Sequence, residues 1–309
     1  MHFLFVGPGA LGCLLYAKFY QGLDTEKNRV SILDYNSSRA DKITQTGITY
    51  HLGDEKHIFP AVASSAPESI VHPDVIIFCV KSYDVLSSLN FCKPLLQKNT
   101  LLLFMQNGIS HLNLTSHIGD ATIAYGTTTE GATRLASGQV RHAGSGVTLL
   151  GFLEPVDQHF MTLLETTRNY FSSGGLQISI TDDILPKLWA KLFVNVGINA
   201  LTAILGCKNG ELLTIPGVAD QMEEAIDEAL LVAQTKGIEI FDDPITTTRV
   251  VANKTAQNIS SMLQDVKNRR KTEIDAINGA IVNEGLLLGV PTPANSRLTQ
   301  QVKDIENTF

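Results

Sequence analysis

The sequence predicts an α/β protein in which an N-terminal doubly wound sheet precedes an all-helical C-terminal domain. Three observations support this fold class. The first half of the 309-residue chain alternates short apolar runs with helix-like segments, helical periodicity dominates from about residue 181, and a glycine-rich turn directly follows the first apolar run. Hydrophobic residues make up 44% and charged residues 18% of the chain, so a large core can form and extended disorder is not expected.

Six apolar runs in the first half are short and continuous. Such runs are typical of strands buried on both faces of a mostly parallel sheet with helices outside it. The segment 47–62 instead predicts a polar-tipped hairpin, inserted before the third parallel strand. The six runs are residues 3–7, 30–34, 75–80, 100–105, 121–126 and 147–152.

The second half has the periodicity of helices over residues 184–206, 216–237 and about 243–289. The length of the chain favours two domains of roughly 150 residues each. We therefore expect a sheet domain over residues 1–178 and a helical, substrate-binding domain over residues 179–309.

Charge and cysteine content exclude several classes of function. A net charge of −7 without a long Lys/Arg run argues against nucleic acid or an anionic membrane as partner. The N-terminus lacks the basic start of a signal peptide, and no stretch has the ~18 uninterrupted apolar residues of a membrane span. Four cysteines without a C-x-x-C pair indicate reduced, buried thiols in a cytoplasmic protein. We expect no metal site.

The stretch "FVGPGALG" places Gly7, Gly9 and Gly12 in G-x-G-x-x-G spacing, after the first strand and before a helix. Gly7 permits a tight turn, Gly9 lets the backbone approach a pyrophosphate, and Gly12 lets the helix pack on the strand. The context indicates a Rossmann-type dinucleotide site, although an ordinary strand–helix turn is the alternative. The expected cofactor-binding residues here are Gly7, Pro8, Gly9, Ala10, Leu11 and Gly12.

Asp34 closes the second strand, where an acidic residue binds the adenosine ribose hydroxyls and selects NAD. Arg39, five residues on, is near enough to meet the 2′-phosphate of NADP instead. The alternative for Asp34 is a helix cap or turn residue.

Polar residues also follow the next strands. In a doubly wound sheet, ligands collect beyond the carboxyl ends of the strands, so these positions favour a site. A surface lysine and a plain Asn-Gly turn are the alternatives. The residues are Lys81, then Gln106, Asn107 and Gly108, then Thr127, Thr128, Glu130 and Ala132.

The apolar helix expected near residues 188–205 carries Lys191, Asn195 and Asn199, four residues apart and so on one slowly drifting face. A solvent-exposed stripe is the alternative, although such a face normally carries more charge. If Lys191 is partly buried instead, its pKa should fall.

A second polar cluster follows in the helical half. Asn258 and Ser261, three residues apart, are expected on one helical face, and Glu273 comes shortly after them. For Glu273 the alternative is a surface i,i+4 pair with Arg269.

Six motifs together resemble the ketopantoate reductase (2-dehydropantoate 2-reductase) family over nearly the whole chain. They are "GPGALG", "VKSYD", "QNGI", "YGTTTEGA", "LWAKLFVNVGINALTAI…CKNGEL" and "NISSMLQDVKNRRKTEIDAINGAI". The resemblance implies NAD(P)H-dependent reduction of 2-dehydropantoate, a 2-keto acid, to (R)-pantoate on the route through pantothenate to coenzyme A. It also implies a Rossmann domain followed by a helical domain.

The resemblance further implies roles for single residues. Lys191 is the general acid, and Glu273 is the acidic residue near the nicotinamide ribose and the reacting centre. Cofactor contacts include Lys81, Asn107 and Ala132. The residues implied to contact or position substrate are Lys81, Asn107, Asn195, Asn199, Asn209, Asn258 and Ser261.

One departure concerns the cofactor. The family usually has an arginine just beyond the second strand for the 2′-phosphate of NADPH, whereas this chain has Asp34 and Tyr35. NADPH is the family default, and Asp34 keeps NADH open, as it does an NADH-dependent reductase of another branched 2-keto acid. A non-catalytic dinucleotide sensor is disfavoured because it has no use for Lys191 and Glu273 together. A homodimer is allowed but not required.

Overall fold

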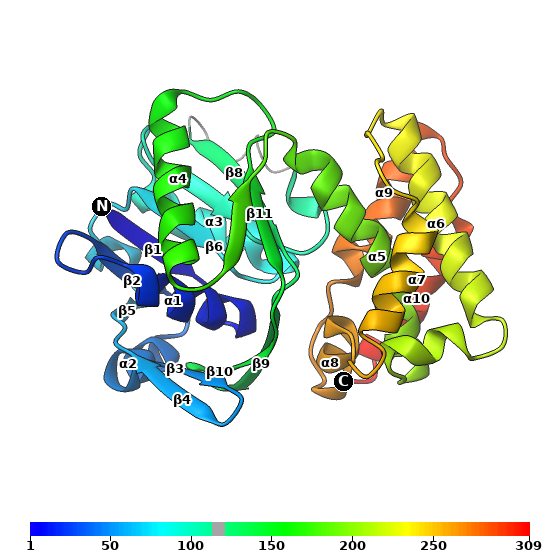
Figure 1. The fold of residues 1–309 in the computed structure, drawn as a ribbon, viewed down its shortest axis with the longest axis horizontal. Coiled ribbons are helices and arrows are strands. Elements are labelled where there is room, and N and C mark those ends of the chain that lie inside the picture. Colours follow the sequence, from blue (N-terminus) through cyan, green and yellow to red (C-terminus); the bar gives the residue numbers. More distant parts are fainter. Residues whose placement is uncertain (113–120) are drawn as a thin grey trace. The chain divides into compact units, whose positions relative to one another are not determined.

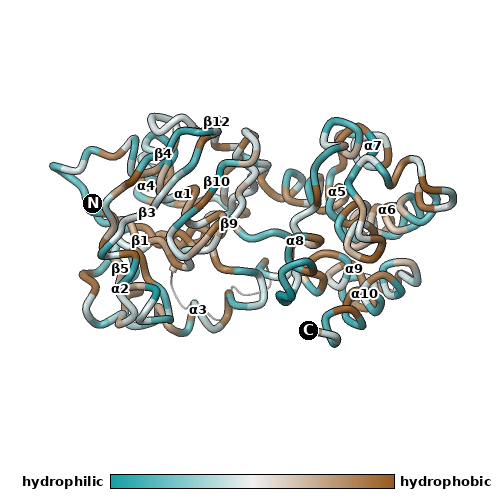
Figure 2. The backbone as a smooth tube through the Cα atoms, turned by 90° about the horizontal axis from the view of Figure 1, so that it is seen from below, coloured by the Kyte–Doolittle hydropathy of each residue, from teal (hydrophilic) through white to brown (hydrophobic). Residues whose placement is uncertain are grey.

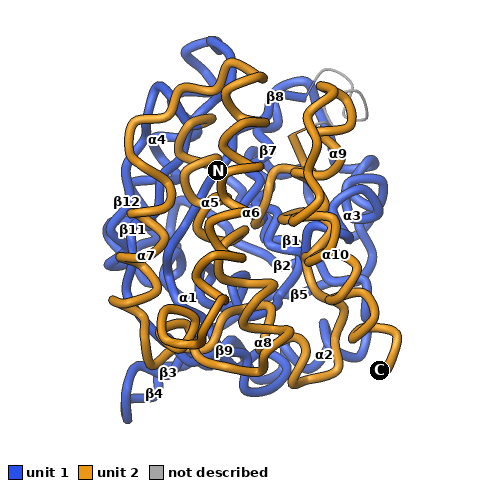
Figure 3. Tube along the Cα trace, turned by 90° about the vertical axis from the view of Figure 1, so that its right-hand side faces the viewer, with its two compact units in different colours: residues 1–106, 113–184 blue, residues 107–112, 185–309 orange. Residues whose placement is uncertain are grey.

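The computed structural model describes residues 1–112 and 121–309. The chain divides into two compact units, which are described separately (Figure 3). Unit 1 comprises residues 1–106 and 113–184, and unit 2 comprises residues 107–112 and 185–309.

Unit 1 is built on an eight-stranded sheet in the order β12-β11-β8-β7-β6-β1-β2-β5. All neighbours pair in parallel except β11 and β8. The order reverses between β1 and β6, so the predicted doubly wound sheet is confirmed. The strands are β1 (His2–Val6), β2 (Arg29–Leu33), β5 (Ala63–Ser64), β6 (Val75–Phe78), β7 (Leu101–Phe104), β8 (Thr122–Thr128), β11 (Val147–Gly151) and β12 (Gln177–Ile180).

Helices cover both faces of this sheet. Figures 1 and 2 show α1 (Ala10–Gly22) and α4 (Gln158–Ser173) on one face and α3 (Val85–Cys92) on the other. Helices α1 and α4 cross closely, since a Cβ atom added at Gly174 would lie 1.7 Å from the carbonyl oxygen of Lys18. The remaining helical segments are α2 (Ser37–Thr46), η1 (Pro67–Ser69), η2 (Ser82–Asp84) and η3 (Lys93–Leu95).

A second, four-stranded sheet has the order β4-β3-β10-β9. Strands β3 (Ile48–Leu52) and β4 (Glu55–Phe59) form an antiparallel hairpin over the segment predicted to be one. The sequence did not predict that β10 (Gln139–Gly144) and β9 (Gly131–Ala136) would join this hairpin. Residues 131–144 therefore belong to a separate sheet and do not extend the main one.

Unit 2 is helical throughout its described residues, as predicted. Figure 2 shows hydrophobic and hydrophilic stretches alternating along its helices, as expected for amphipathic helices around a core. That core includes Trp189, Phe193, Met222 and Ile281. Its elements are α5 (Ile184–Leu205), η5 (Asn209–Leu213), α6 (Val218–Thr235), α7 (Pro244–Lys254), α8 (Ser261–Lys267), η6 (Ile274–Ala276), α9 (Asn278–Leu288) and α10 (Pro293–Glu306).

The single helical stretch expected over about residues 243–289 is wrong, because it is broken into several short elements. Ser260 caps α8 by accepting a hydrogen bond from the Leu263 backbone N–H at 3.0 Å, which marks a new helix start. Arg269 has a φ of 50°, a left-handed conformation that no helix interior adopts.

The two units divide at Ile184, whereas the sequence placed the boundary after residue 178. Strand β12 explains this difference, because it still pairs with β11 through Ile180. Residues 107–112, expected in the first domain, lie in unit 2: the Ile109 N–H donates to the carbonyl of Ala276 at 3.3 Å, and Ile109 belongs to the core of unit 2.

Helix α5 is long and apolar enough, by length and composition alone, to cross a membrane. However, 67% of its most apolar window is buried inside the protein. That burial is what the central helix of a folded core shows.

Candidate active site

The glycine-rich turn between β1 and α1 has the backbone shape of a pyrophosphate cradle. Gly7 has a φ of 90°, and a Cβ atom there would lie 2.5 Å from the Val80 side chain. A Cβ atom at Gly12 would lie 2.1 Å from the carbonyl oxygen of Gly7. Gly9 caps α1 without a side-chain bond and has open space beside it. The turn therefore fits a dinucleotide, whose phosphates would meet the unpaired amides of a 13-residue helix.

Pro8, Ala10 and Leu11 complete this turn. Pro8 is buried, and its carbonyl accepts a hydrogen bond from the Cys13 thiol at 3.3 Å. Ala10 and Leu11 are partly exposed at the start of α1. The bond from Cys13, which is buried in α1, ties the turn to the core side of this helix.

Gln106 braces the neighbouring strand end, a role that sequence reasoning did not assign. Its side-chain amide donates to the carbonyls of Phe78 at 2.9 Å and Val80 at 3.2 Å, and the residue is 4% exposed. Val80 in turn packs against Gly7. Lys81 follows at the start of η2, partly buried and beyond the carboxyl end of β6, as the sequence placed it.

Asp34 is engaged by the protein itself. Its two carboxylate oxygens accept hydrogen bonds from Nε and Nη2 of Arg39, and Oδ1 also accepts one from the Asn36 N–H at 3.1 Å. The Asp34 side chain is only 1% exposed. The ion pair raises the pKa of Arg39 above its usual value. This geometry favours the turn role of Asp34 over binding of ribose hydroxyls.

Arg39 lies at the same edge of the sheet, and Asp34 uses only some of its N–H donors. Its guanidinium lies 5.1 Å from the centre of the Tyr35 ring, and its side chain is 22% exposed. Tyr35 is largely exposed. A guanidinium has five N–H donors, so Arg39 can bind an anion without releasing Asp34.

Unit 2 contains a chain of hydrogen bonds through three of the predicted residues. The Lys191 ammonium donates to Oδ1 of Asn107 at 2.8 Å, and Nδ2 of Asn107 donates to Oε2 of Glu273 at 3.0 Å. Positions 84 and 166 residues apart in the sequence are thus brought together. Glu273 is 5% exposed, so a surface pair with Arg269 is not its role.

The environment of Lys191 lowers the pKa of its ammonium, which nevertheless stays mostly protonated at pH 7. Burial lowers the pKa of Lys191 to about 8, and the attraction of Glu273 acts in the opposite direction. Burial also lowers the pKa of His111 to about 4, so this imidazole is neutral at pH 7. Sequence reasoning missed His111, because this histidine belongs to no motif with a recognisable spacing.

The stripe on α5 is not solvent-exposed. Lys191 and Asn195 are partly buried, and Asn199 is only 5% exposed. Within residues 1–112 and 121–309, the side chains of Asn195 and Asn199 make no hydrogen bond, and their amide atoms are not sealed in the core. Both amides are therefore available to a ligand.

The other predicted substrate residues lie around the turn before α8. Asn209 is buried; its amide donates to the Thr255 hydroxyl at 2.9 Å, and its backbone N–H donates to the Asn258 carbonyl at 3.0 Å. Asn258 and Ser261 are exposed. They do not share a helical face as expected, because Asn258 precedes α8 and Ser261 is its first residue.

Ala132 lies in β9, directly opposite His142 of β10. A buried network fixes this strand: Glu130 accepts from the Gly146 N–H at 2.9 Å and contacts Nε2 of His142 at 2.5 Å, and the Tyr50 hydroxyl bonds Nδ1 of His142 at 2.9 Å. The Glu130 carboxylate therefore binds to β10, through His142, and to the segment after it, through Gly146.

Comparison with known proteins covers both units. The family described as "Ketopantoate reductase PanE/ApbA" matches residues 3–155, and "Ketopantoate reductase PanE/ApbA C terminal" matches residues 183–306. The 2-dehydropantoate 2-reductase of Halobacterium salinarum is 31% identical over 300 residues, 96% of each chain. That of Vibrio cholerae is 32% identical over 314 residues, 100% of this chain and 99% of the relative.

Solved structures agree with these matches. A PanE/ApbA family ketopantoate reductase from Ralstonia eutropha JMP134 has a TM-score of 0.89 at 29% identity, covering 100% of this chain and 99% of that one. A D-mandelate dehydrogenase with NADH and anilino(oxo)acetate has a TM-score of 0.89 at 26% identity, with the same coverage. With both family regions matched and curated relatives aligned end to end, the chain belongs to the ketopantoate reductase family.

Proposed function

We propose that the protein reduces 2-dehydropantoate to (R)-pantoate with NADPH, a step towards pantothenate and coenzyme A. The observation that carries this proposal is the Lys191–Asn107–Glu273 chain of hydrogen bonds in unit 2. The full-length relatives with this named activity support the choice of substrate.

A reduced nicotinamide dinucleotide supplies a hydride to the keto carbon when it is bound. Residues 7–12 are the part of the chain that would hold its pyrophosphate, since a Cβ atom at Gly7 or Gly12 clashes and Gly9 faces open space. Lys81, Asn107, Ala132 and Glu273 are further proposed contacts to the cofactor, which we carry over from the family pattern.

Lys191 is the proposed general acid. Negative charge grows on the substrate carbonyl oxygen as the keto group is reduced, and an ammonium stabilises it and donates the proton. Asn107 accepts one N–H of Lys191 and so aims the ammonium, while Glu273 fixes the Asn107 amide. The ammonium has three N–H donors, and the bond to Asn107 fixes the direction of one of them.

The remaining polar residues are proposed to orient the keto acid without adding charge. The amides of Asn195 and Asn199 are unengaged within the described residues, so they can bond to substrate oxygens. Asn258 and Ser261 are exposed and suited to the same role. Asn209 is committed to Thr255 and to the Asn258 backbone, so we propose that it positions the Asn258 turn.

NADPH is the proposed reductant because Arg39, and not Asp34, presents its side chain at the end of β2. The Asp34 carboxylate is buried beneath the guanidinium, which makes it a poor acceptor for ribose hydroxyls. The guanidinium suits the 2′-phosphate, because planar N–H donors recognise phosphate well.

The substrate and cofactor specificity of the protein tests the proposed function. Oxidation of NADPH and of NADH by the purified full-length protein is followed with 2-dehydropantoate and with a panel of branched and aromatic 2-keto acids. We expect the highest kcat/KM for 2-dehydropantoate. A second candidate function is the NADH-dependent reduction of another 2-keto acid, which the D-mandelate dehydrogenase neighbour supports. A higher value for a different 2-keto acid, such as phenylglyoxylate, the keto counterpart of mandelate, would favour this second candidate.

The pH dependence of kcat/KM is expected to fall on the alkaline side with an apparent pKa near 8. Burial lowers the pKa of Lys191 to about 8, so the required proton is lost as pH rises through that value. Glu273 attracts the ammonium and raises its pKa. Glu273→Gln, which still accepts a hydrogen bond from Asn107, should therefore move the alkaline limb to lower pH. A limb that stays in place or moves upward contradicts the assignment.

A further inference from the structure

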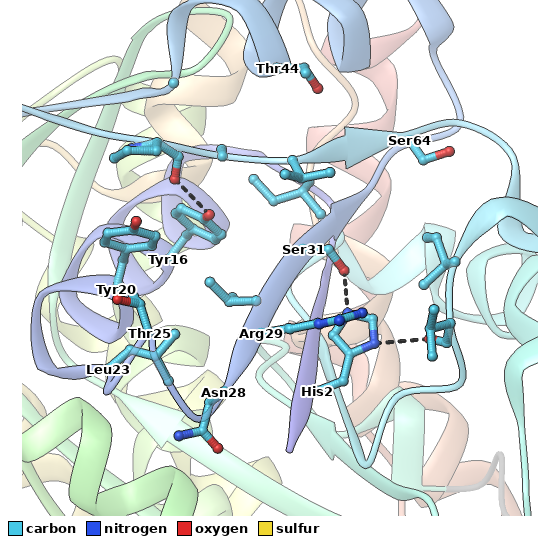
Figure 4. A pocket seen from close by; sticks show the side chains of 18 of the residues that line it. His2, Tyr16, Tyr20, Leu23, Thr25, Asn28, Arg29, Ser31, Thr44 and Ser64 are labelled. Carbon is cyan, nitrogen blue, oxygen red and sulfur yellow. Dashed lines mark hydrogen bonds between the residues drawn. The ribbon is translucent and has the colours of Figure 1, made fainter.

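Unit 1 contains a pocket of about 690 Å³ that the proposed reaction does not use (Figure 4). Its walls come from the C-terminal half of α1, from β2, from the end of α2, and from the segments around residues 58–64 and 69–71. Pockets that bind small molecules are typically between about 300 and 1,000 Å³. The size of this pocket therefore suits a small organic ligand.

The pocket is separate from the glycine-rich turn. His2 and Arg29, which line it, open strands β1 and β2, whereas Gly7 and Asp34 follow the opposite ends of the same strands. A five-residue strand spans about 16 Å at ~3.3 Å per residue. The lining also reaches Ile32 and Ser64, near the carboxyl ends of β2 and β5, but it includes none of residues 7–12. An acidic group bound at Arg29 would therefore lie at the amino end of β2, away from the proposed pyrophosphate cradle.

Much of the lining is apolar and open to solvent. Ile58, Val62 and Val71 are 57%, 66% and 63% exposed, and all three line this pocket. Tyr16 and Tyr20 from α1 stack at 6.0 Å between ring centres and add an aromatic wall. Large apolar side chains gathered on one exposed concave surface are typical of a binding site.

One wall of the pocket is basic. Arg29 is exposed, and no carboxylate lies within 4.0 Å of it among the residues that the structure describes. His2 beside it bonds Ser31 Oγ at 2.7 Å and the Val71 carbonyl at 2.9 Å, as drawn in Figure 4. Burial lowers the pKa of His2, and behind it the Asp74 carboxylate accepts the His2 backbone N–H at 2.7 Å, so Arg29 is the lining residue that stays positively charged.

We propose that this pocket binds a small organic anion, with its apolar body against Tyr20, Ile58 and Val62 and its acidic group at Arg29. The pairing follows from charge and shape: an apolar wall accepts the body, and the guanidinium meets a carboxylate, sulfonate or phosphate. The site does not depend on the proposed reduction, because none of its residues belongs to the Lys191 chain or to the glycine-rich turn.

The probe for this proposal is 8-anilinonaphthalene-1-sulfonate, a fluorescent anion with an aromatic body. It is titrated into the full-length protein saturated with NADP⁺, so that the dinucleotide site is occupied. We expect saturable binding with one probe per chain. Absence of binding under these conditions overturns the proposal.

Three variants locate the bound probe. Arg29→Gln removes the cation, and Val62→Asp places a negative charge on the exposed apolar rim; each should weaken binding by about fivefold or more. Lys27→Gln is the matched control, because this exposed lysine pairs with Asp24 and does not line the pocket. Equal affinity of wild type, Arg29→Gln and Val62→Asp shows that the probe binds elsewhere and overturns the proposal. Arg29 and Val62 are both exposed, so the two variants are expected to fold.

Discussion

Replacement of Lys191 by alanine is expected to lower kcat by about 10³-fold while NADPH binding stays nearly unchanged. The loss combines removal of a general acid with removal of a positive charge from the developing oxyanion, and each effect alone is worth about 10²-fold or more. Affinity for NADPH, measured by quenching of its fluorescence on titration, separates chemistry from binding. Near-normal kcat in Lys191→Ala rules out the assignment.

Two further variants sharpen this test. Lys191→Arg keeps a cation but cannot release its proton near neutral pH, because the guanidinium pKa stays above about 12. If proton donation matters as much as charge, this variant should be nearly as slow as Lys191→Ala. Lys187→Ala is the control, since this lysine lies one turn earlier on α5 and contacts the ring of Phe241 at 4.8 Å; its kcat should be unchanged.

Replacement of Arg39 by leucine is expected to lower kcat/KM for NADPH by about 10- to 100-fold and to leave that for NADH nearly unchanged. This range corresponds to the loss of one charge-assisted bond to the 2′-phosphate. The measurement is kcat/KM for NADPH and for NADH, in wild type and variant, with 2-dehydropantoate held at saturation. A wild-type preference for NADH contradicts the proposed role of Arg39.

The same substitution leaves Asp34 buried without its partner, which lowers stability. The double variant Asp34→Asn with Arg39→Leu removes the unpaired charge and should recover much of the thermal stability. If the double variant melts near the wild-type temperature and still discriminates against NADPH, the fall in kcat/KM for NADPH is caused by lost phosphate binding. Recovery of NADPH activity in the double variant would show instead that an unpaired Asp34 had repelled the phosphate.

The fold was predictable to the extent that local pattern specifies it. The continuous apolar runs predicted the strands of the parallel sheet, because strands buried on both faces have few polar positions. The second sheet was missed because β9 and β10 carry polar residues, and because β10 pairs with a hairpin strand 90 positions earlier in the sequence, Gln139 with Thr49. The break before α8 was missed because it depends on Ser260 as a cap, whose hydroxyl also receives a hydrogen bond from Thr202 of α5.

By itself the sequence determined the glycine-rich turn, the helical stripe of Lys191, Asn195 and Asn199, and the family resemblance, because each depends on residue type and short-range spacing. Only the tertiary structure joined Lys191 to Asn107 and Glu273, which are far apart in the chain. Tertiary structure also gave Asp34 its partner: the buried carboxylate accepts two hydrogen bonds from the guanidinium of Arg39, a pairing that the spacing of the two residues did not specify. The physical reason is common to both. A buried charged group is stable only where partners reach it, and the fold decides which partners do.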